Sequence, residues 1–293
     1  MEIRTLRYLM AVAQEGSISN AAASLHMTQP TLSRQLSALE DEMGCSLFTR
    51  TYKGMELNDN GARLLRYAET IIELTEKAEN DLSSNEGSVK GSVYIGAGES
   101  VNMRYVSEAI QLTLKRFPEV DFQLFSGTSV DLMDGMARGT YDFLLECELK
   151  EHVDMNVLAL PVLDRWGVMT LRGSRLSTLE SVRPTDLVGE TLLMARQAMK
   201  TGMLNKWAGK VANDLDIRIM YSLPLNAMLL ARAGAGTLLT YEGLFETGSD
   251  TELTFVPLEP ELTSRQGIIW RKGLLSKQAT AFLDALQECL MKA

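Results

Sequence analysis

The chain has 293 residues, 45% of them hydrophobic, which is enough for roughly two or three domains with buried cores. Its formal net charge of −9 at pH 7 gives little bulk attraction to nucleic-acid phosphate. We find neither a secretory leader nor an uninterrupted apolar run of the ~18 residues of a membrane helix, so we expect a globular cytoplasmic protein without a membrane partner.

The first predicted elements are two short helices joined by a tight turn within residues 17–50. Ser17 can cap the first helix and Thr28 the second, whose first turn tolerates Pro30 because the N–H that proline lacks is unpaired there anyway. The inward faces carry Ala21, Ala22 and Leu25 on the first helix, and Leu32, Leu36, Leu39 and Met43 on the second. This pattern predicts a helix-turn-helix, a motif that binds duplex DNA.

The second of these helices has a polar face near its N-terminus, opposite the apolar stripe. Gln29, Thr31, Ser33 and Arg34 lie on that face. A recognition helix inserts its N-terminal residues into the major groove, where amide, hydroxyl and guanidinium groups bind base edges. We therefore predict that these four side chains contact DNA.

A longer set of residues extends the motif. Its members are Ala21, Ala22, Leu25, Gln29, Pro30, Leu32, Ser33, Arg34, Gln35, Leu39, Glu40, Gly44, Leu47, Phe48 and Arg50. With them, residues 6–61 closely resemble the N-terminus of the LysR-type transcriptional regulators. The resemblance implies a winged helix-turn-helix, with short strands at 47–51 and 55–57 and a wing turn at 52–54 over the adjacent backbone or minor groove. The candidate DNA-binding residues are then Ser17, Thr28, Gln29, Pro30, Thr31, Ser33, Arg34, Arg50 and Lys53.

The charges of this region are few and unevenly placed. Residues 1–60 carry five basic and seven acidic side chains, a balance of −2. Arg34, Arg50 and Lys53 fall on the predicted recognition helix and wing, whereas residues 40–42 are acidic and lie at the far end of that helix. Because one copy attracts phosphate weakly, we expect tight binding to require two or more copies on one operator.

A long helix without proline is predicted over residues 59–82. It begins at Asn58, where the family more often has threonine, and asparagine caps a helix as well. Its apolar residues recur at alternating spacings of four and three, as in a coiled-coil seam: Leu64, Ala68, Ile71, Thr75, Ala78 and Leu82. The periodicity also fits an amphipathic helix packed on its own core, and the position after a winged helix favours a dimerisation helix. Residues 80–88 are predicted to be a flexible hinge.

The remainder of the chain alternates between strand and helix patterns, which is typical of parallel α/β sheets. A first set has strands at 92–97, 120–125 and 141–146 with helices at 101–116 and 129–138. A second set has strands at 166–171, 191–195, 217–222 and 237–240, with helices near 184–187 and over 200–212 and 225–232. A strand at 266–271 and a helix at 276–291 are expected to return to the first set.

The predicted fold class is α/β with an all-α-rich N-terminal part. Residues 1–58 are the expected winged helix-turn-helix and residues 59–88 the linker helix and hinge. The resemblance implies that residues 89–293 form a two-lobed, periplasmic-binding-protein-like effector domain. We expect lobe I to comprise residues 89–162 and 266–293, and lobe II residues 163–265.

In such a domain a ligand binds in the crevice between lobes, at the carboxyl ends of strands. The candidate effector-binding residues in these loops are Glu99, Ser100, Gly127, Thr128, Ser129, Arg196 and Asn226. The hydroxyls of Ser100, Thr128 and Ser129, with helix N–H groups, suit an anion. Glu99 instead favours an amine or hydroxyls, unless it faces solvent or pairs with Arg104. Helix capping explains the loop residues equally well, and Arg196 either binds an anion or solvates a loop.

Several other functions lack support in the sequence. Cys45, Cys147 and Cys289 are odd in number and far apart, which fits neither a disulfide framework nor a zinc site. His26 and His152 suggest no catalytic pair, and no phosphate-binding glycine loop is present. Cys147 has no cysteine partner in the second lobe, which argues against a redox switch. We expect no enzyme activity, no cofactor and no metal.

The sequence thus predicts a DNA-binding transcriptional regulator that responds to a small-molecule effector. The expected partners are double-stranded promoter DNA, an effector of unknown identity, further copies in a homodimer or homotetramer, and RNA polymerase as a further candidate. The alternative is a small-molecule-binding protein without functional DNA readout. Gln29, Ser33, Arg34 and Arg50 argue against that alternative.

Overall fold

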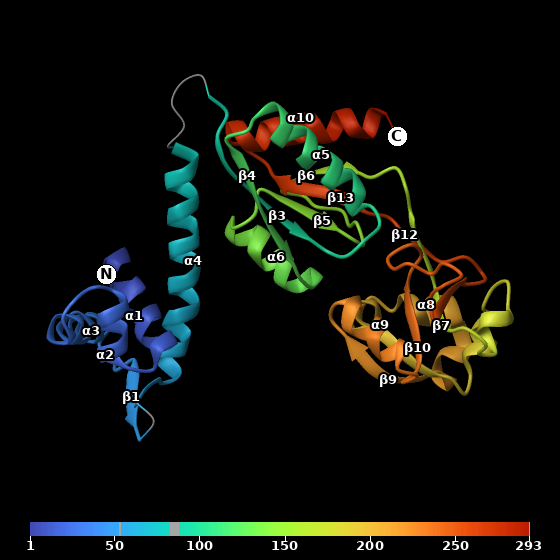
Figure 1. Cartoon of the computed structure of the whole chain (residues 1–293), viewed down its shortest axis with the longest axis horizontal. Coiled ribbons are helices and arrows are strands. Elements are labelled where there is room, and N and C mark those ends of the chain that lie inside the picture. The colour runs from blue at the N-terminus through green and yellow to red at the C-terminus, as the bar shows by residue number, and fades with distance from the viewer. Residues whose placement is uncertain (53, 83–87, 293) are drawn as a thin grey trace. The chain divides into compact units, whose positions relative to one another are not determined.

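The computed structural model describes residues 1–52, 54–82 and 88–292, so Lys53 and most of the predicted hinge lie outside the described residues. The chain separates into two compact units, Met1–Ser83 and Ser84–Ala293 (Figure 1). Within the described ranges, no helix is both long and apolar enough to cross a lipid bilayer.

The first unit has short helices, a β-hairpin and a long helix. Its elements are α1 (Ile3–Glu15), α2 (Ile18–Ser24), α3 (Gln29–Met43), β1 (Phe48–Thr51), β2 (Gly54–Leu57) and α4 (Asp59–Leu82). The predicted cap of α2 is confirmed, because Ser17 Oγ accepts a hydrogen bond from the Asn20 N–H at 3.5 Å. The predicted cap of α3 is wrong in its chemistry: Thr28 Oγ1 pairs with Thr31 Oγ1 at 2.8 Å and caps no backbone N–H.

The inward faces of α2 and α3 form the core that the sequence predicts. Ala21, Ala22, Leu32, Leu36 and Leu39 are all buried. Leu25 is half-buried, and the prediction for Met43 is wrong, since this side chain is 37% exposed. Met43 is the last residue of α3 and extends past the packed part of the helix. The turn between the helices is tight because His26 adopts a left-handed backbone with φ of 53°.

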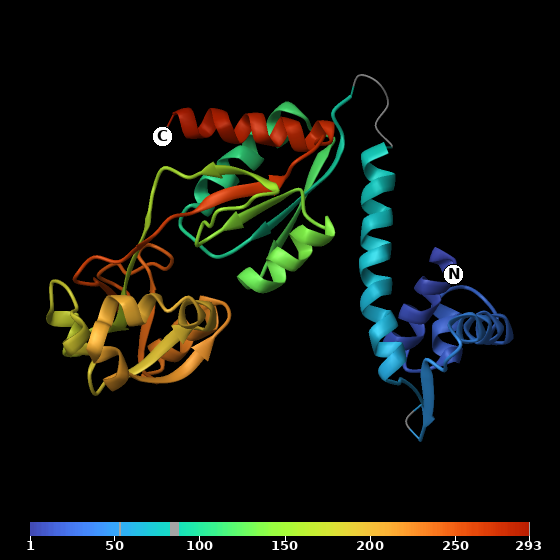
Figure 2. The ribbon, with the colours of Figure 1, turned by 180° about the vertical axis from the view of Figure 1, so that it is seen from behind.

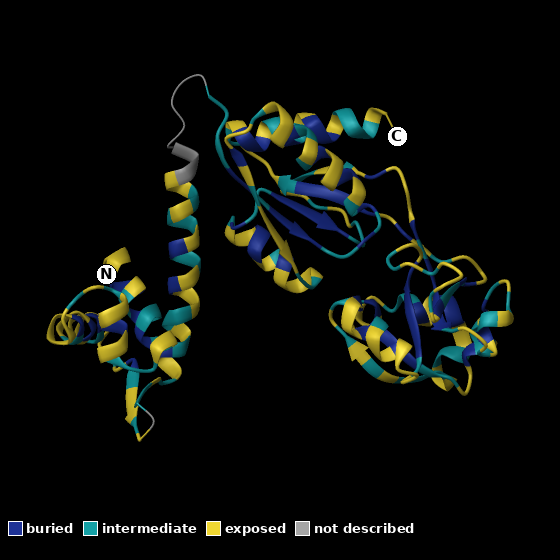
Figure 3. Cartoon of the chain, in the orientation of Figure 1, coloured by how far each residue is buried: buried dark blue, intermediate teal, exposed yellow. Residues whose placement is uncertain are grey.

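The residues predicted to form a coiled-coil seam on α4 do not all face the same surroundings. Asn58 caps the helix as expected, with Oδ1 accepting a hydrogen bond from the Gly61 N–H at 3.0 Å. Ala68 and Ile72 are buried against α1 in the same chain, and Leu64 and Ile71 pack on that core. Ala78 is exposed, and Figure 3 shows that α4 carries both exposed and buried residues along its length. The seam prediction is therefore partly wrong, because α1 covers the face of α4 that contains Ala68.

The second unit contains two sheets, and the first of them with its helices is lobe I. Its strands are β3 (Gly91–Ala97), β4 (Val120–Ser126), β5 (Phe143–Glu146), β6 (Met155–Ala159) and β13 (Gly267–Arg271), in the order β4-β3-β5-β13-β6. The first three strands run parallel as predicted, and β13 is antiparallel to β5 and β6. Helices α5 (Met103–Arg116) and α10 (Lys277–Met291) cover one face, and α6 (Ser129–Arg138) covers the other (Figure 2).

The second sheet with its helices is lobe II. Its strands are β7 (Asp164–Leu171), β8 (Thr191–Ala195), β9 (Asp216–Tyr221), β10 (Thr237–Tyr241), β11 (Leu253–Pro257) and β12 (Thr263–Ser264). The order is β11-β7-β10-β8-β9, with β12 paired to β7. Successive residues point to opposite faces, so Leu192 and Leu239 enter one core, while Leu193 and Leu238 pack under α9 (Pro224–Arg232) in the other.

One helix prediction for lobe II is wrong. Residues 200–212 do not form one helix but belong to α7 (Arg196–Lys200), α8 (Met203–Ala208) and the 3₁₀ helix η3 (Gly209–Asp214). Gly202 and Gly209 have positive φ of 66° and 55°, a backbone that an α-helix cannot continue through. The helix predicted near residues 184–187 is present as the 3₁₀ helix η2 (Pro184–Leu187).

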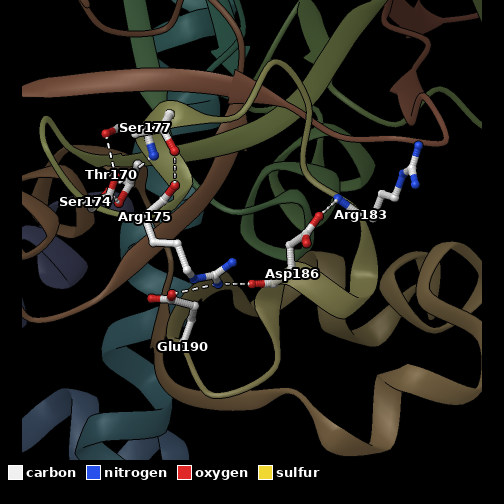
Figure 4. A network of polar contacts seen from close by, with 8 residues as sticks. Thr170, Ser174, Arg175, Ser177, Arg183, Asp186 and Glu190 are labelled. Atoms are coloured by element: carbon white, nitrogen blue, oxygen red, sulfur yellow. Dashed lines mark hydrogen bonds and ion pairs between the residues drawn. The ribbon is translucent and has the colours of Figure 1, made fainter.

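A polar network fixes η2 and the neighbouring 3₁₀ turn η1 (Leu176–Thr178) (Figure 4). Arg175 donates to Glu190 Oε1 at 2.9 Å and also to the carbonyl oxygen of Asp186. The Asp186 carboxylate in turn accepts from the Arg183 N–H at 2.8 Å. Asp186 lies 11 positions and Glu190 lies 15 positions after Arg175 in the chain. The Arg175 guanidinium thus holds the two ends of this segment together in a compact turn.

Two segments join the lobes, residues 160–163 between β6 and β7, and residues 265–266 between β12 and β13. They lie side by side, since the Leu160 N–H donates to the Gln266 carbonyl oxygen at 3.0 Å. The two lobes are therefore connected at one place, the double crossing.

Candidate functional site

The N-terminal half of α3 presents a polar surface. Gln29, Pro30, Thr31 and Arg34 are exposed, and Ser33 is half-buried. On the opposite side of the same helix, Leu32 is completely buried. The helix is thus anchored by its apolar stripe and leaves amide, hydroxyl and guanidinium groups facing outward, as direct readout of base edges requires.

The wing is the hairpin β1–β2, in which Thr51 pairs with Gly54 across the turn. Arg50 is exposed on β1, and Tyr52 at the tip is 94% exposed. The backbone of β2 is attached to the end of α1, because the Met55 N–H donates to the Gly16 carbonyl oxygen at 2.8 Å. Sequence reasoning did not select Tyr52, whose exposure becomes evident only when the hairpin register is known.

Glu40 positions the hairpin β1–β2 relative to α3. Its Oε1 accepts from the Leu47 N–H at 2.6 Å and from the Phe48 N–H at 3.3 Å. The carboxylate therefore satisfies two backbone donors at the start of β1. The sequence suggested only a negative charge at the far end of α3, because the contact depends on how the chain folds back after the helix.

A cleft between the lobes encloses about 850 Å³, part of it open to solvent. Lobe I contributes loops that follow β3, β4 and β5, and lobe II contributes loops that follow β8, β9 and β10. The carboxyl ends of strands in both lobes therefore meet there, as expected for a ligand site in an α/β fold.

The predicted effector residues divide between this cleft and other roles. Glu99, Gly127 and Ser129 line it, whereas half-buried Thr128 and exposed Arg196 and Asn226 lie outside its lining. Thr128 caps α6, with Oγ1 accepting from the Asp131 N–H and donating to Asp131 Oδ2. The capping explanation thus accounts for Thr128.

The second lobe offers different side chains from those predicted. Gln197, rather than Arg196, lines the cleft, and Ser222 precedes α9 where Asn226 was expected. Successive residues of a helix point about 100° apart, so an error of one position exchanges a cleft residue for an exposed one. Gln197 Oε1 accepts hydrogen bonds from the Ser129 N–H at 3.2 Å and from Ser129 Oγ at 3.4 Å, which links the two lobes across the cleft.

Ser100 belongs to a buried network at the double crossing and lines a second pocket between the lobes, which shares Gly98, Glu99 and Leu244 with the cleft. Its Oγ accepts from the Asn102 N–H at 3.0 Å. Asn102 Nδ2 donates to Asp164 Oδ1 at 2.9 Å and to Gln266 Oε1 at 3.1 Å. Burial raises the pKa of Asp164 to about 6, against the lowering effect of hydrogen bonds from Ser100 and Asn102.

Burial also changes the acid–base properties of the cleft. It raises the pKa of Glu99 and of Glu148, and for Glu148 the nearby Lys150 acts in the opposite direction. The pKa of the Cys147 thiol is raised strongly, first by burial and then by the negative charges of surrounding carboxylates. A thiol in this environment stays protonated, which makes it a poor nucleophile. Among the described residues, no group of three or more potential ligands is arranged to hold a metal ion.

Two family models match the chain. The model for the bacterial regulatory helix-turn-helix protein, lysR family, matches residues 3–62, and the LysR substrate binding domain matches residues 86–290, which is more than half of the chain. The chain belongs to the LysR family. The two matches correspond to the unit with the polar α3 face and the unit with the cleft.

This LysR-family chain is similar to several known regulators. The probable RuBisCO transcriptional regulator of Cyanophora paradoxa is 29% identical over 187 residues, which cover 63% of this chain and 58% of that protein. The DNA-binding transcriptional dual regulator OxyR of Escherichia coli (strain K12) is 29% identical over 279 residues, covering 93% of this chain and 90% of OxyR. The solved structure of full-length CbnR complexed with its target DNA has a TM-score of 0.76 at 20% identity, covering 99% of this chain and 100% of that one, which shows a shared fold.

Proposed function

We propose that this LysR-family chain is a transcriptional regulator that binds promoter DNA sequence-specifically and responds to a small molecule in the cleft of its second unit. The observation that carries the first part is the exposed polar face of α3 on a helix whose other face is buried in the winged-helix core. OxyR, a DNA-binding regulator, and CbnR, solved with its target DNA, support it by similarity. A protein that binds promoters must reach the chromosome, so the proposal includes a cytoplasmic location.

The proposal assigns a role to each part of the chain. Residues 1–58 bind DNA, residues 59–88 form the linker, and residues 89–293 bind the effector. Within the last part, lobe I comprises residues 89–162 and 266–293, and lobe II residues 163–265. In the DNA-binding part, the bases are contacted by Gln29, Thr31, Ser33 and Arg34. The DNA backbone is contacted by Ser17, Thr28 and Pro30. Arg50 and Lys53 act from the wing.

The slightly negative net charge of the DNA-binding part supports the proposal that the protein acts as an oligomer. The balance of −2 over residues 1–60 leaves each copy few phosphate contacts, so two or four copies on one operator are needed for tight binding. We propose a homodimer through the linker helices and a homotetramer as a dimer of dimers. Closure of the lobes on a ligand would change the spacing of the winged helices and hence the DNA bend. RNA polymerase is a further candidate partner.

The test is a fluorescence-anisotropy titration of the full chain with DNA from upstream of its own gene and with scrambled DNA, over a salt series. We expect saturable preference for the upstream fragment and steep weakening with salt. Equal, weak binding to both fragments would instead support a ligand-binding protein without DNA readout.

Arg34→Ala separates base contacts from phosphate contacts. If Arg34 binds a base, specific binding weakens by about 1–3 kcal/mol and scrambled DNA is affected less. Arg4→Ala is the matched control, because Arg4 is also exposed in the first unit but lies on α1. Equal losses on both DNAs in Arg34→Ala would reduce Arg34 to a phosphate contact.

A further inference from the structure

Several hydrogen-bond donors in or beside the cleft are already engaged within the protein. The N–H and hydroxyl of Ser129, at the start of α6, both donate to Gln197 Oε1. Trp166 Nε1 donates to Ser264 Oγ at 2.9 Å, and Tyr221 Oη donates to the Leu239 carbonyl oxygen at 2.7 Å. A carboxylate that bound to these donors would have to displace existing hydrogen bonds, and each displaced acceptor would need a new partner.

The charges of the cleft favour a cation. The lining residues include three carboxylates, those of Glu99, Glu146 and Glu148, against the single cation of Lys150. Glu146 already has a partner, because His152 Nε2 lies 2.8 Å from its Oε2 and both side chains are largely buried. Among the described residues, Glu99 and Glu148 are thus the carboxylates of the cleft without a hydrogen-bonded side chain, and Lys150 lies near Glu148.

The Glu99 carboxylate has no positively charged partner among the described residues. Glu99 is half-buried at the end of β3, and its carboxylate has no hydrogen bond or ion pair with the part of the chain that the structure describes. Arg104, the candidate partner from the sequence, instead donates to Tyr105 Oη at 2.9 Å, with its guanidinium carbon 4.7 Å from that ring centre. A half-buried carboxylate without a counter-charge costs free energy that a cationic ligand would offset.

An aromatic wall lies in the same cleft. Trp166, Tyr221 and Tyr241 all line it, and the rings of Trp166 and Tyr241 meet edge to face with centres 4.5 Å apart. Glu99 and Tyr221 line the same cleft, and burial, and in smaller part the negative charge of Glu99, raises the pKa of Tyr221. Aromatic faces beside a carboxylate are the environment in which proteins bind organic ammonium groups.

We propose that the cleft binds a small organic cation, in which an ammonium group pairs with Glu99 and an apolar body packs against the aromatic wall of Trp166, Tyr221 and Tyr241. This inference rests on the proposed function, in which the cleft is the effector site. It names the chemical class of the effector.

Three probes of nearly equal size and different charge test the inference: 2-phenylethylammonium, 2-phenylethanol and phenylacetate. Each is titrated by calorimetry at constant ionic strength into the full chain, into Glu99→Gln and into Glu119→Gln. Glu119 is the matched control, because it is an exposed glutamate of lobe I outside the cleft. We expect the wild type to bind the ammonium at least about tenfold more tightly than phenylacetate. Glu99→Gln should abolish most of this preference, and Glu119→Gln should keep it.

Three results would overturn the inference: phenylacetate binding as tightly as the ammonium, an unchanged preference in Glu99→Gln, or no ammonium binding at millimolar concentration. If Glu99→Gln does not fold, the order of the three probes on the wild type decides alone. The same wild-type sample is titrated with upstream and scrambled DNA. Preference for upstream DNA together with an overturning result would refute only the ligand class, whereas loss of DNA preference would refute the proposed function whichever probe binds.

Discussion

Replacing Asp164 by asparagine should remove the pH-dependent free-energy cost of a buried, charged carboxylate from the second unit. Asp164 is 3% exposed in the network at the double crossing, and its pKa rises from 3.8 to about 6 because burial disfavours the charged carboxylate. The folded state therefore holds a proton that the unfolded chain has released. The stabilising contribution of this proton is complete below the unfolded pKa of 3.8 and is lost as the pH rises through about 6.

The magnitude follows from the difference between the two pKa values. A difference of about 2 units corresponds to about 3 kcal/mol of unfolding free energy between acidic and neutral pH. About 2 kcal/mol of this falls between about pH 4.5 and pH 7.5. Asparagine retains an Oδ1 that can accept from Asn102 Nδ2, which reaches Asp164 Oδ1 at 2.9 Å in the wild type. The variant should thus gain stability relative to the wild type as the pH rises.

Urea denaturation at several pH values measures this difference. The chain's three tryptophans, Trp166, Trp207 and Trp270, all belong to the second unit, so their fluorescence follows its unfolding. Asp214→Asn, at an exposed position of lobe II, is the control and should parallel the wild type at every pH. If the free-energy difference between Asp164→Asn and the wild type stays constant from pH 4.5 to 7.5, Asp164 does not titrate as argued.

Three further predictions concern other parts of the chain. Leu32→Ala should destabilise the first unit by about 2–5 kcal/mol, since Leu32 is fully buried, and circular dichroism should show an earlier transition without a change in tryptophan fluorescence. Gly61→Ala should lower stability in the same assay despite alanine's helix propensity, because its Cβ would lie 2.0 Å from the Leu47 carbonyl oxygen; a stabilised variant would contradict this. Cys147 should be alkylated much more slowly at pH 8 in the folded chain than in urea, as followed by mass spectrometry, because burial and nearby carboxylates raise its pKa; similar rates would refute a protonated, enclosed thiol.

Local signals in the sequence were sufficient for the helix-turn-helix and for several elements of the second unit. The 4-3-4 spacing of Leu32, Leu36, Leu39 and Met43 predicted the inward face of α3, and three of the four residues are buried. Strand β8 and helix α6 have the predicted bounds, because a β-branched or apolar run and a Thr–Gly pair of caps act within a few residues. Half-exposed strands such as β6 and β11 lack a clear alternation and were not predicted.

The sequence by itself determined the bounds of elements such as β8 and α6, since caps, turns and periodicity are properties of neighbouring residues. The tertiary structure decided which partner each face meets: α1, rather than a second chain, covers Ala68 of α4, and Gln197, rather than Arg196, faces the cleft. It also showed that Arg104 lies with Tyr105 and leaves Glu99 without a counter-charge. These contacts join residues far apart in the chain, and periodicity shows that a face is buried but not what covers it.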